Sequence, residues 1–213
     1  MIRAVSVDLD GTLYSLERAK APLLWATFPR WRTMRVGRAV REELRGRDFA
    51  DGLSLLAAEA RVVAERLDVD VATARSALDD IFLVRLTRVL GRIGPFAGAR
   101  EVLSSLSSRG LKLALVSDRG AAREKLAALG LADLPWAAVV SADETGVLKP
   151  SAAVLATTAA RLGVAPAELL HVGDRDDADG AAARAAGCAS VIIDPRQARP
   201  LDVVLAALSS IKE

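Results

Sequence analysis

The sequence predicts an α/β fold that combines a mostly parallel sheet of about five strands with an inserted α-helical domain. Three observations predict it. Short, apolar, often Val-rich runs alternate with longer Ala- and Leu-rich segments of helical periodicity, which is typical of strand–helix–strand units. Glycines follow most of these helical segments. About a hundred residues without a convincing strand separate the first apolar run from the second.

The expected strands are short and mostly apolar, as strands buried on both faces should be. They span residues 2–9, 111–117, 137–141, 169–173 and 189–193. The helices expected around this sheet span residues 98–109, 120–129, 151–162, 178–186 and 201–211. The first four are followed by glycines typical of helix ends, at Gly110, Gly130, Gly163 and Gly187.

Residues 15–93 contain several amphipathic helical stretches and form an insertion between the first two strands. These 79 residues leave 134 of the 213 for the sheet region, since 213 − 79 = 134, so the insertion is large enough to be a small helical domain. We place its boundaries near Tyr14 and Gly94. The prediction is a catalytic core of residues 1–14 and 94–213 and a helical domain of residues 15–93.

Composition excludes several classes of protein. The net charge of only +2 gives no global field that would attract nucleic acid. A single cysteine, Cys188, excludes an internal disulfide, and a single histidine, His171, excludes multi-histidine metal sites. The chain has no apolar run of signal-peptide or membrane-spanning length, so we expect a cytoplasmic protein with no nucleic-acid or membrane partner.

Two carboxylates lie where the first strand gives way to a glycine turn. Residues 7–13 read Val-Asp-Leu-Asp-Gly-Thr-Leu, so Asp8 and Asp10 are two residues apart. Alternation in an extended strand sends both side chains to one side, where they repel unless a cation or a shared proton intervenes. A bound magnesium ion would relieve that repulsion. The alternative is an ordinary solvated Asp-Gly turn.

A second acidic cluster follows the fourth strand. It contains four aspartates within six residues, Asp174, Asp176, Asp177 and Asp179. Oxygen-only ligands suit a hard cation, and magnesium is usually held by one or two carboxylates together with substrate phosphate and water. The spacing does not match the calcium loop, which needs glycine at position six and glutamate at position twelve.

Two further polar groups follow strands. Ser117 and Asp118 close the second strand, and Lys149 precedes a proline at the start of a helix. Ligands of open parallel sheets bind at the carboxyl ends of the strands, which is where these residues and both acidic clusters fall. A nucleophilic carboxylate, a hydroxyl donor, a fixed cation and a magnesium cluster are the groups that phosphoryl transfer needs.

These motifs, in this order, resemble the four motifs of the haloacid dehalogenase (HAD) superfamily. The matching stretches are Val-Asp-Leu-Asp-Gly-Thr-Leu at 7–13, Val-Ser at 116–117, Leu-Lys-Pro at 148–150, and Val-Gly-Asp at 172–174 with Asp179. The resemblance spans the whole 134-residue core. The insertion matches a helical cap in position, length and helical character. The resemblance implies a three-layer Rossmannoid core with that cap.

The resemblance also implies roles for the motif residues. Asp8 would attack phosphorus to form an aspartyl-phosphate, and Asp10 would protonate the leaving oxygen and then activate water. Ser117 and Lys149 would hold the phosphoryl oxygens. Asp118 would also belong to the phosphate site, although relatives commonly carry asparagine at that position.

The metal and the phosphate loop follow in the same way. The resemblance implies that Mg²⁺ is bound by Asp8, Asp174 and the main-chain carbonyl of Asp10, with Asp179 behind them as an orienting carboxylate. Gly11 and Thr12 would shape the phosphate loop. Relatives commonly carry asparagine where Ala178 stands, at the outer metal shell.

The function that this pattern implies is a magnesium-dependent phosphomonoester hydrolase acting through an aspartyl-phosphate on a small phosphorylated metabolite. Asp10 favours the phosphatase branch, because the dehalogenating branch lacks an acid there. Only Lys20 could serve as the Schiff-base lysine of the phosphonate-cleaving branch.

The alternatives are a phosphosugar mutase, which would shield the same intermediate from water, and a non-catalytic protein that binds an anion or a partner.

Other features of the sequence have plain structural interpretations. Arg35, Arg38, Arg41 and Arg45 fall on one helical face, which could bind an anionic substrate, but arginine outnumbers lysine 24 to 5 and we favour a solvated helix. Aromatic residues at 25, 28 and 31 have the spacing of the inserted domain's own core. His171 lies inside a strand and is expected to be structural, and Cys188 to be a buried apolar residue.

Overall fold

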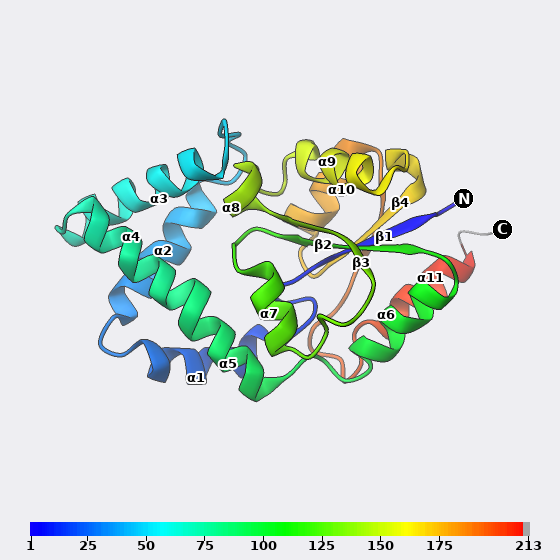
Figure 1. Ribbon diagram of the computed structural model, residues 1–213, viewed down its shortest axis with the longest axis horizontal. Coiled ribbons are helices and arrows are strands. Elements are labelled where there is room, and N and C mark those ends of the chain that lie inside the picture. The colour runs from blue at the N-terminus through cyan, green and yellow to red at the C-terminus, as the bar shows by residue number, and fades with distance from the viewer. Residues whose placement is uncertain (211–213) are drawn as a thin grey trace.

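A five-stranded parallel sheet forms the centre of the computed structural model, which describes residues 1–210 (Figure 1). The strand order is β3-β2-β1-β4-β5, and all four pairings are parallel. The fold class and the five expected strands are confirmed. The strands are β1 (Ala4–Asp8), β2 (Lys112–Ser117), β3 (Trp136–Ser141), β4 (Leu169–Gly173) and β5 (Ala189–Ile192).

Helices cover both faces of the sheet and make the three layers of an α/β core. Figure 1 shows α9 and α10 on one face and α6, α7 and α11 on the other. The bounds of the core helices are α6 (Ala99–Ser108), α7 (Ala122–Ala128), α8 (Ala142–Thr145), α9 (Ala152–Leu162), α10 (Ala181–Ala186) and α11 (Asp202–Ser210). A short 3₁₀ helix, η2 (Pro166–Glu168), precedes β4, and a π-helical turn, η3 (Asp176–Gly180), leads into α10.

Most helices agree with the sequence-based expectation within two residues at each end. The four glycines expected at helix ends all have positive φ, at +80°, +68°, +63° and +74° for Gly110, Gly130, Gly163 and Gly187. The helix expected over 178–186 is split between η3 and α10. Residue 211, the last of the helix expected over 201–211, lies outside the described residues.

Side-chain alternation along the strands decides which helices pack on which face. Val5 and Val7 of β1 point into the larger apolar cluster, which α6, α7 and α11 complete. Ala4 points the other way and packs with Leu162 of α9. Cys188 is half-buried at the edge of this second face, and burial raises the pKa of its thiol to about 11.

The segment between β1 and β2 is helical, as expected, and is called the helical insert below. It consists of α1 (Leu16–Thr27), α2 (Trp31–Glu43), α3 (Gly52–Leu67), α4 (Val71–Asp79), the π-helix η1 (Asp80–Arg85) and α5 (Leu86–Ile93). Ser15, Asp51 and Asp70 cap the starts of α1, α3 and α4 by accepting hydrogen bonds from backbone amides. The domain boundaries drawn from the sequence remain a prediction.

The helical insert shares its apolar packing with the core. Leu23 of α1 and Leu90 of α5 belong to the same apolar cluster as Leu9 at the end of β1. Helices α2, α3 and α4 form a second cluster that also takes in Ala142 and Leu148 of the core. The insert is therefore packed against the core at both of its ends.

Three joints attach the helical insert to the core. The two chain crossings lie side by side, because the Phe96 amide donates to the Leu13 carbonyl at 2.9 Å. The third joint is a contact between loops: Asp48 forms an isolated antiparallel bridge with Val147, and the Phe49 amide donates to the Gly146 carbonyl at 3.2 Å. This joint lies at the α3 and α8 end of the insert, away from the crossings near α1 and α5 (Figure 1).

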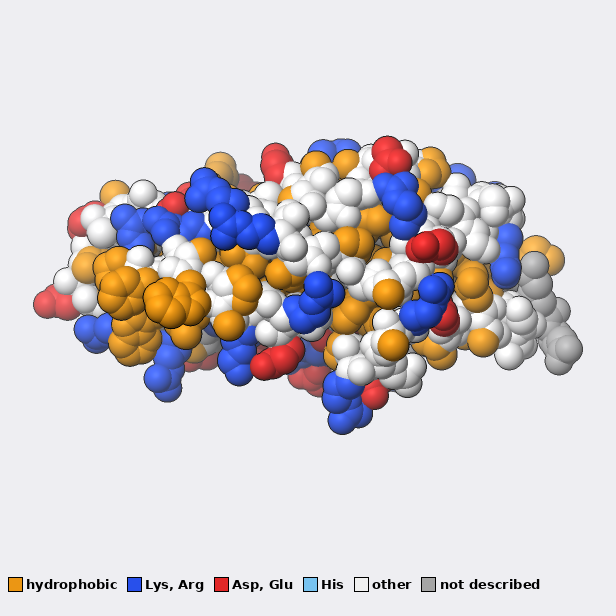
Figure 2. All heavy atoms as spheres, turned by 90° about the horizontal axis from the view of Figure 1, so that it is seen from below, with side chains coloured by type: hydrophobic (Ala, Val, Ile, Leu, Met, Phe, Trp, Pro, Cys, Tyr) orange, Lys and Arg blue, Asp and Glu red, His pale blue; other side chains and the backbone are white. Residues whose placement is uncertain are grey.

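The aromatic residues near the start of α2 do not form a core of the insert, so that interpretation is wrong. Trp25, Phe28 and Trp31 are 83%, 71% and 43% exposed. The buried positions of α1 are Ala19, Leu23 and Thr27, spaced four residues apart, which places Trp25 on the outward face. Figure 2 shows apolar side chains gathered at this end of the molecule.

Within residues 1–210, no helix combines the length and the apolar character that crossing a bilayer requires.

Candidate active site

A cavity of about 180 Å³ opens at the carboxyl ends of β1, β2 and β4, between the core and the helical insert. The site therefore lies at the sheet edge that the sequence predicts. The core side of the cavity is lined by Asp8, Asp10, Asp118, Arg119, Lys149, Asp174 and Asp179, among others. The insert side includes Leu16, Lys20, Leu23, Arg38, Arg41 and Arg45.

Asp8 lies at the end of β1 and is only 5% exposed. Its carboxylate accepts hydrogen bonds from the Lys149 ammonium and, at 3.1 Å, from the Thr12 hydroxyl. Burial raises the pKa of Asp8 well above its ordinary value, Lys149 lowers it in part, and the neighbouring carboxylates of Asp179 and Asp10 raise it further. Positive charge near Asp8 therefore decides whether the carboxylate is ionised.

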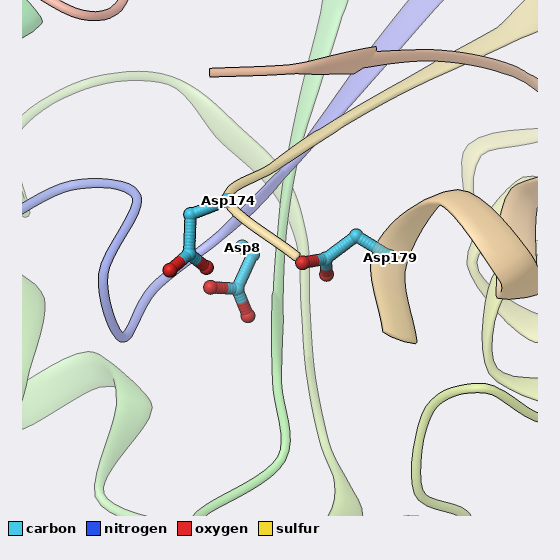
Figure 3. A group of neighbouring side chains, drawn as sticks. All are labelled: Asp8, Asp174 and Asp179. Atoms are coloured by element: carbon cyan, nitrogen blue, oxygen red, sulfur yellow. The ribbon is translucent and has the colours of Figure 1, made fainter. Parts of the chain in front are cut away.

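Three carboxylates meet beside β1. Asp8, Asp174 and Asp179 each offer an oxygen, and these oxygens lie within 4.8 Å of one another (Figure 3). Burial, and then the charge of Asp179, raise the pKa of Asp174. Two of the three carboxylates, Asp8 and Asp174, therefore resist ionisation, and a hard divalent cation at this cluster of oxygen donors would offset their charge.

Gly11 allows the β1 loop to pass close to this cluster. Its φ is +96°, and a Cβ atom at this position would lie 2.4 Å from Asp174 Oδ2. Thr12, fully buried, follows it and donates to Asp174 Oδ1 at 3.4 Å as well as to Asp8. The Gly-Thr pair thus holds the β1 loop against the β4 loop.

The Lys149 ammonium joins two of the carboxylates. It donates to Asp8 and, at 2.6 Å, to Asp179. Its own burial lowers the pKa of Lys149, but the charges of Asp8, Asp118 and Asp179 more than offset this and hold the pKa above its ordinary value. Lys149 is therefore a fixed cation at the centre of the site.

His171 is structural, as expected, and it orients Asp179. The buried ring approaches Asp179 Oδ1 through Nε2 at 3.2 Å and Ser6 Oγ through Nδ1 at 2.8 Å. We assign the proton to Nε2, so that His171 donates to the carboxylate and accepts from the Ser6 hydroxyl. Burial lowers the pKa of His171, which favours this neutral form. The Arg175 amide donates to the other Asp179 oxygen at 3.1 Å.

The Asp10 side chain has different neighbours from Asp8. The Tyr14 hydroxyl donates to one of its oxygens, and Lys125 Nζ lies 4.0 Å from the other. Burial raises the pKa of Asp10, but Lys125, Tyr14 and Arg119 together outweigh burial and lower it. Two carboxyl groups two residues apart are thus held in different electrostatic environments, with the pKa of Asp8 raised and that of Asp10 lowered.

Ser117 is the last residue of β2, and Asp118, which follows it, lines the cavity. The buried Ser117 hydroxyl accepts from the Arg119 amide at 3.2 Å, which leaves its proton free to donate. Both Asp118 oxygens are engaged, one with Arg45 at 2.6 Å and one with the Lys149 amide at 3.1 Å. A role for Asp118 in binding phosphate remains a prediction; in this structure its carboxylate joins the helical insert to the Lys149 loop.

The four aspartates after β4 divide into two pairs. Asp174 and Asp179 point into the carboxylate cluster. Asp176 pairs with Arg184 at 2.7 Å and Asp177 with Arg175 at 2.6 Å, both on the surface. Only the first pair can serve the site.

The arginine stripe of α2 is not simply solvated, so that interpretation is wrong for two of its four members. Arg41 is 4% exposed and pairs with Asp143 and Glu59. Arg45 donates to Asp118 and, at 2.8 Å, to the Lys149 carbonyl. Arg35 and Arg38 are exposed, so only the later part of the stripe packs against the core, and the spacing in the sequence does not show which of the four arginines make these contacts.

Sequence reasoning missed several buried or partly buried polar residues around the cavity: Tyr14, Glu59, Arg119, Lys125 and Asp143. Arg119 links β2 to the insert, because it pairs with Glu59 at 3.0 Å and lies over the Phe82 ring at 3.8 Å. The available signal was Lys125, a lysine in line with the apolar residues of α7. The other contacts join residues too distant in sequence for any local pattern to show.

Comparisons with known proteins identify the family. The family model described as haloacid dehalogenase-like hydrolase matches residues 2–187. A phosphoglycolate phosphatase from Xylella fastidiosa is 34% identical over 197 residues, covering 89% of this chain and 79% of that protein. A phosphoserine phosphatase from Thermus thermophilus is 33% identical over 195 residues, covering 87% and 75%.

Solved structures agree on the fold. A 2-haloacid dehalogenase from Pseudomonas syringae superimposes with a TM-score of 0.67 at 22% identity, over 99% of this chain and 100% of that chain. The resemblance seen in the motifs is thus matched by family, by sequence and by fold. The chain belongs to the haloacid dehalogenase-like hydrolases and is an enzyme of that family.

Proposed function

We propose that the chain is a magnesium-dependent phosphomonoester hydrolase that acts through an aspartyl-phosphate on a small phosphorylated metabolite. The observation that supports this most directly is the position of Asp8, which lies between the Lys149 ammonium and two further carboxylates, Asp174 and Asp179. The names of the two relatives described above, both phosphatases, support the same reaction class. In this proposal residues 1–14 and 94–213 are the catalytic core and residues 15–93 the cap.

Two steps make up the proposed reaction. In the first, an Asp8 oxygen attacks phosphorus, the bond from phosphorus to the ester oxygen breaks, and Asp10 gives its proton to the departing alcohol. An anionic ester entering the cavity raises the proton affinity of Asp10, because it adds negative charge nearby. In the second step Asp10 takes a proton from water, the water oxygen attacks phosphorus, and the bond to Asp8 breaks to release phosphate.

The fixed groups of the site position the phosphoryl oxygens. Lys149 supplies a cation and Ser117 a free hydroxyl proton. Mg²⁺ would be held by Asp8, Asp174 and the main-chain carbonyl of Asp10, with Asp179 behind. When bound, the ion supplies positive charge that keeps Asp8 ionised and withdraws charge from the phosphoryl oxygens.

Removal of the metal tests this function. With p-nitrophenyl phosphate, we expect phosphate release in the presence of Mg²⁺ and a loss of at least about 100-fold in chelator, since a catalytic metal contributes several kcal/mol of charge stabilisation. Rapid quenching followed by mass spectrometry should find phosphate on the peptide that contains Asp8. Equal rates with and without chelator, or no phosphorylated peptide, would contradict the proposal.

Tyr14→Phe tests the proposed role of Asp10 as the proton donor to the leaving group. The substitution removes the hydroxyl that donates to the Asp10 carboxylate, so the proton donor loses its fixed orientation. We expect kcat/KM for an alkyl phosphate to fall about tenfold. For p-nitrophenyl phosphate, whose leaving group needs no protonation, the expected loss is below about threefold. Equal losses for the two esters would show that Tyr14 only supports the fold.

A further inference from the structure

The helical insert holds the loop that carries Lys149. Gly146 and Val147 form the third joint with the loop that follows α2. Leu148 comes next, is fully buried, and belongs to the apolar cluster that α2, α3 and α4 form. The three residues before Lys149 are therefore fixed by contacts with the insert.

One ion pair between the core and the insert binds both main-chain groups of Lys149. Asp118, which follows β2 in the core, accepts a hydrogen bond from the Lys149 amide at 3.1 Å. Arg45, which follows α2 in the insert, donates to the Lys149 carbonyl at 2.8 Å. The Arg45 guanidinium also donates to the Asp118 carboxylate, at 2.6 Å. Arg45, Asp118 and Lys149 thus form a closed ring of hydrogen bonds, and loss of either side chain opens it.

The Arg45–Asp118 pair is better shielded from water than a surface pair of the insert. Its two side chains are 18% and 13% exposed, whereas those of the Arg66–Glu43 pair are 41% and 54% exposed. Burial lowers the pKa of Arg45, but Asp118 and Glu42 together outweigh burial and raise it, so the guanidinium stays charged. A shielded pair is screened less by salt and holds its geometry more firmly than an exposed one.

The contacts of Asp118 argue against a direct bond from its carboxylate to phosphate. One oxygen is bound by the Arg45 guanidinium and the other by the Lys149 amide. A carboxylate also repels an anionic phosphoryl group. Asp118 can instead affect the phosphate through the main chain of Lys149.

The position of the Lys149 main chain matters because its ammonium group has two partners to reach. The ammonium donates to Asp8 and, at 2.6 Å, to Asp179. In the proposed function the same group also holds the phosphoryl oxygens. A displacement of about 1 Å in a group of this kind can cost about 100-fold in rate. A contact that fixes the main chain of Lys149 therefore contributes to catalysis without touching the substrate.

We infer that Arg45 and Asp118 are positioning residues that together fix the main chain of Lys149, so that the helical insert sets the place of the phosphoryl-binding cation of the core. This inference rests on the proposed function and deepens it, because it gives the insert a part in placing a catalytic group. It predicts that the two residues act as a unit, and that they act through Lys149.

A double-mutant cycle tests whether Arg45 and Asp118 act as a unit. Asp118→Asn keeps an oxygen for the Lys149 amide but loses the charge that binds Arg45, and Arg45→Gln removes the guanidinium. With p-nitrophenyl phosphate and Mg²⁺, each substitution should lower kcat about 10- to 100-fold and change KM less, since a fixed cation acts most strongly in the transition state. The double variant should lose no more than the worse single variant, because its second change removes a partner that is already lost. Losses that multiply would overturn the inference.

The Lys149→Met background tests whether the pair acts through Lys149. Methionine has no ammonium group to be placed, so adding Asp118→Asn or Arg45→Gln to it should change the remaining rate less than about threefold. A direct contact of either side chain with the substrate predicts the full loss of the single variant in this background too. That result would overturn the inference.

Arg66→Gln is the matched control. It makes the same replacement in the insert, where Arg66 pairs with Glu43 on the surface and does not line the cavity. The kcat of Arg66→Gln should stay within about twofold of the native value. A loss as large as that of Arg45→Gln would overturn the inference, because any weakened ion pair of the insert would then have the same effect.

Arg45→Lys keeps the test valid if Arg45→Gln does not fold. Circular dichroism at the assay temperature checks the fold of each variant. Lysine keeps the charge and a donor but not the fork, so Arg45→Lys should recover part of the loss in kcat. It can also replace Arg45→Gln in the cycle with Asp118→Asn, with the same rule for the double variant.

Failure of the reaction itself gives a different result. A native chain that does not hydrolyse p-nitrophenyl phosphate with Mg²⁺ contradicts the proposed function. Calorimetry with inorganic phosphate then measures the same cycle as binding. Asp118→Asn and Arg45→Gln should each weaken phosphate binding about tenfold, and the double variant should bind no more weakly than the worse of them. Losses that multiply, or no binding by the native chain, would overturn the inference.

Discussion

Asp8→Asn lowers the rate of magnesium-dependent phosphate release by about 10⁴-fold or more, the scale seen when an enzyme loses its covalent nucleophile. The amide has nearly the same shape as the carboxylate but cannot attack phosphorus. It also removes a partner of the buried Lys149 ammonium and one oxygen anion from the carboxylate cluster. Higher Mg²⁺ concentrations should therefore not restore the rate.

Asp176→Asn is the matched control, because it makes the same replacement of a carboxylate by an amide. Asp176 belongs to the same acidic run after β4, but its side chain is 66% exposed and pairs with Arg184 outside the cluster. The rate of phosphate release by Asp176→Asn should stay within about twofold of the native rate, because most surface substitutions have small effects. Calorimetry should show that Asp8→Asn still binds inorganic phosphate, because Lys149 and Ser117 remain. A rate above about 1% of native in Asp8→Asn would place the nucleophile elsewhere.

Lys149→Met has the second largest expected effect, and it acts on both stability and rate. Methionine leaves the buried carboxylates of Asp8 and Asp179 without their shared cation. Breaking a buried ion pair from one side typically costs about 3–5 kcal/mol, because the remaining charge stays desolvated. Phosphate release should fall about 10³-fold, since a fixed cation on the phosphoryl oxygens is lost as well.

Denaturant unfolding with and without Mg²⁺ measures the stability part. In Lys149→Met the negative charge of Asp8 and Asp179 is no longer offset by an ammonium group, and a divalent cation at the carboxylate cluster can offset it instead. Mg²⁺ should therefore raise the free energy of unfolding more in Lys149→Met than in the native chain. Lys112→Met is the control, because Lys112 is exposed and donates only to the Leu162 carbonyl at 2.6 Å. Similar midpoints for the two variants would contradict the assigned burial of the Lys149 pair.

The fold could be predicted because its information is local. Apolar runs of strand length, helical periodicity and glycines at positive φ each act within a few residues, and Gly110 or Gly187 ends its helix whatever surrounds it. The motif residues could be placed together because the carboxyl ends of parallel strands share one edge. This rule was enough to group Asp8, Ser117 and Lys149 into one site without any distance between them.

The remainder of the site depends on contacts between distant residues. Arg119 meets Glu59, 60 positions away, and Arg45 meets Asp118, 73 positions away. Helical periodicity shows that Arg41 and Arg45 share a face, but only packing decides whether that face meets water or a second set of charges. The outward position of Trp25 was within reach of the sequence, since it lies between two inward positions of α1.

The three joints of the helical insert limit its freedom of movement in a definite way. A body held by two adjacent chain crossings retains one rotation, about the line that joins them. The loop contact between Phe49 and Gly146 lies off that line and opposes the rotation, as do the Arg45–Asp118 and Arg119–Glu59 pairs. Gly146 is three residues before Lys149, so the loop that holds the insert against the core also carries the cation of the site. A rotation of the insert that breaks or strains this contact would therefore act directly on the position of Lys149.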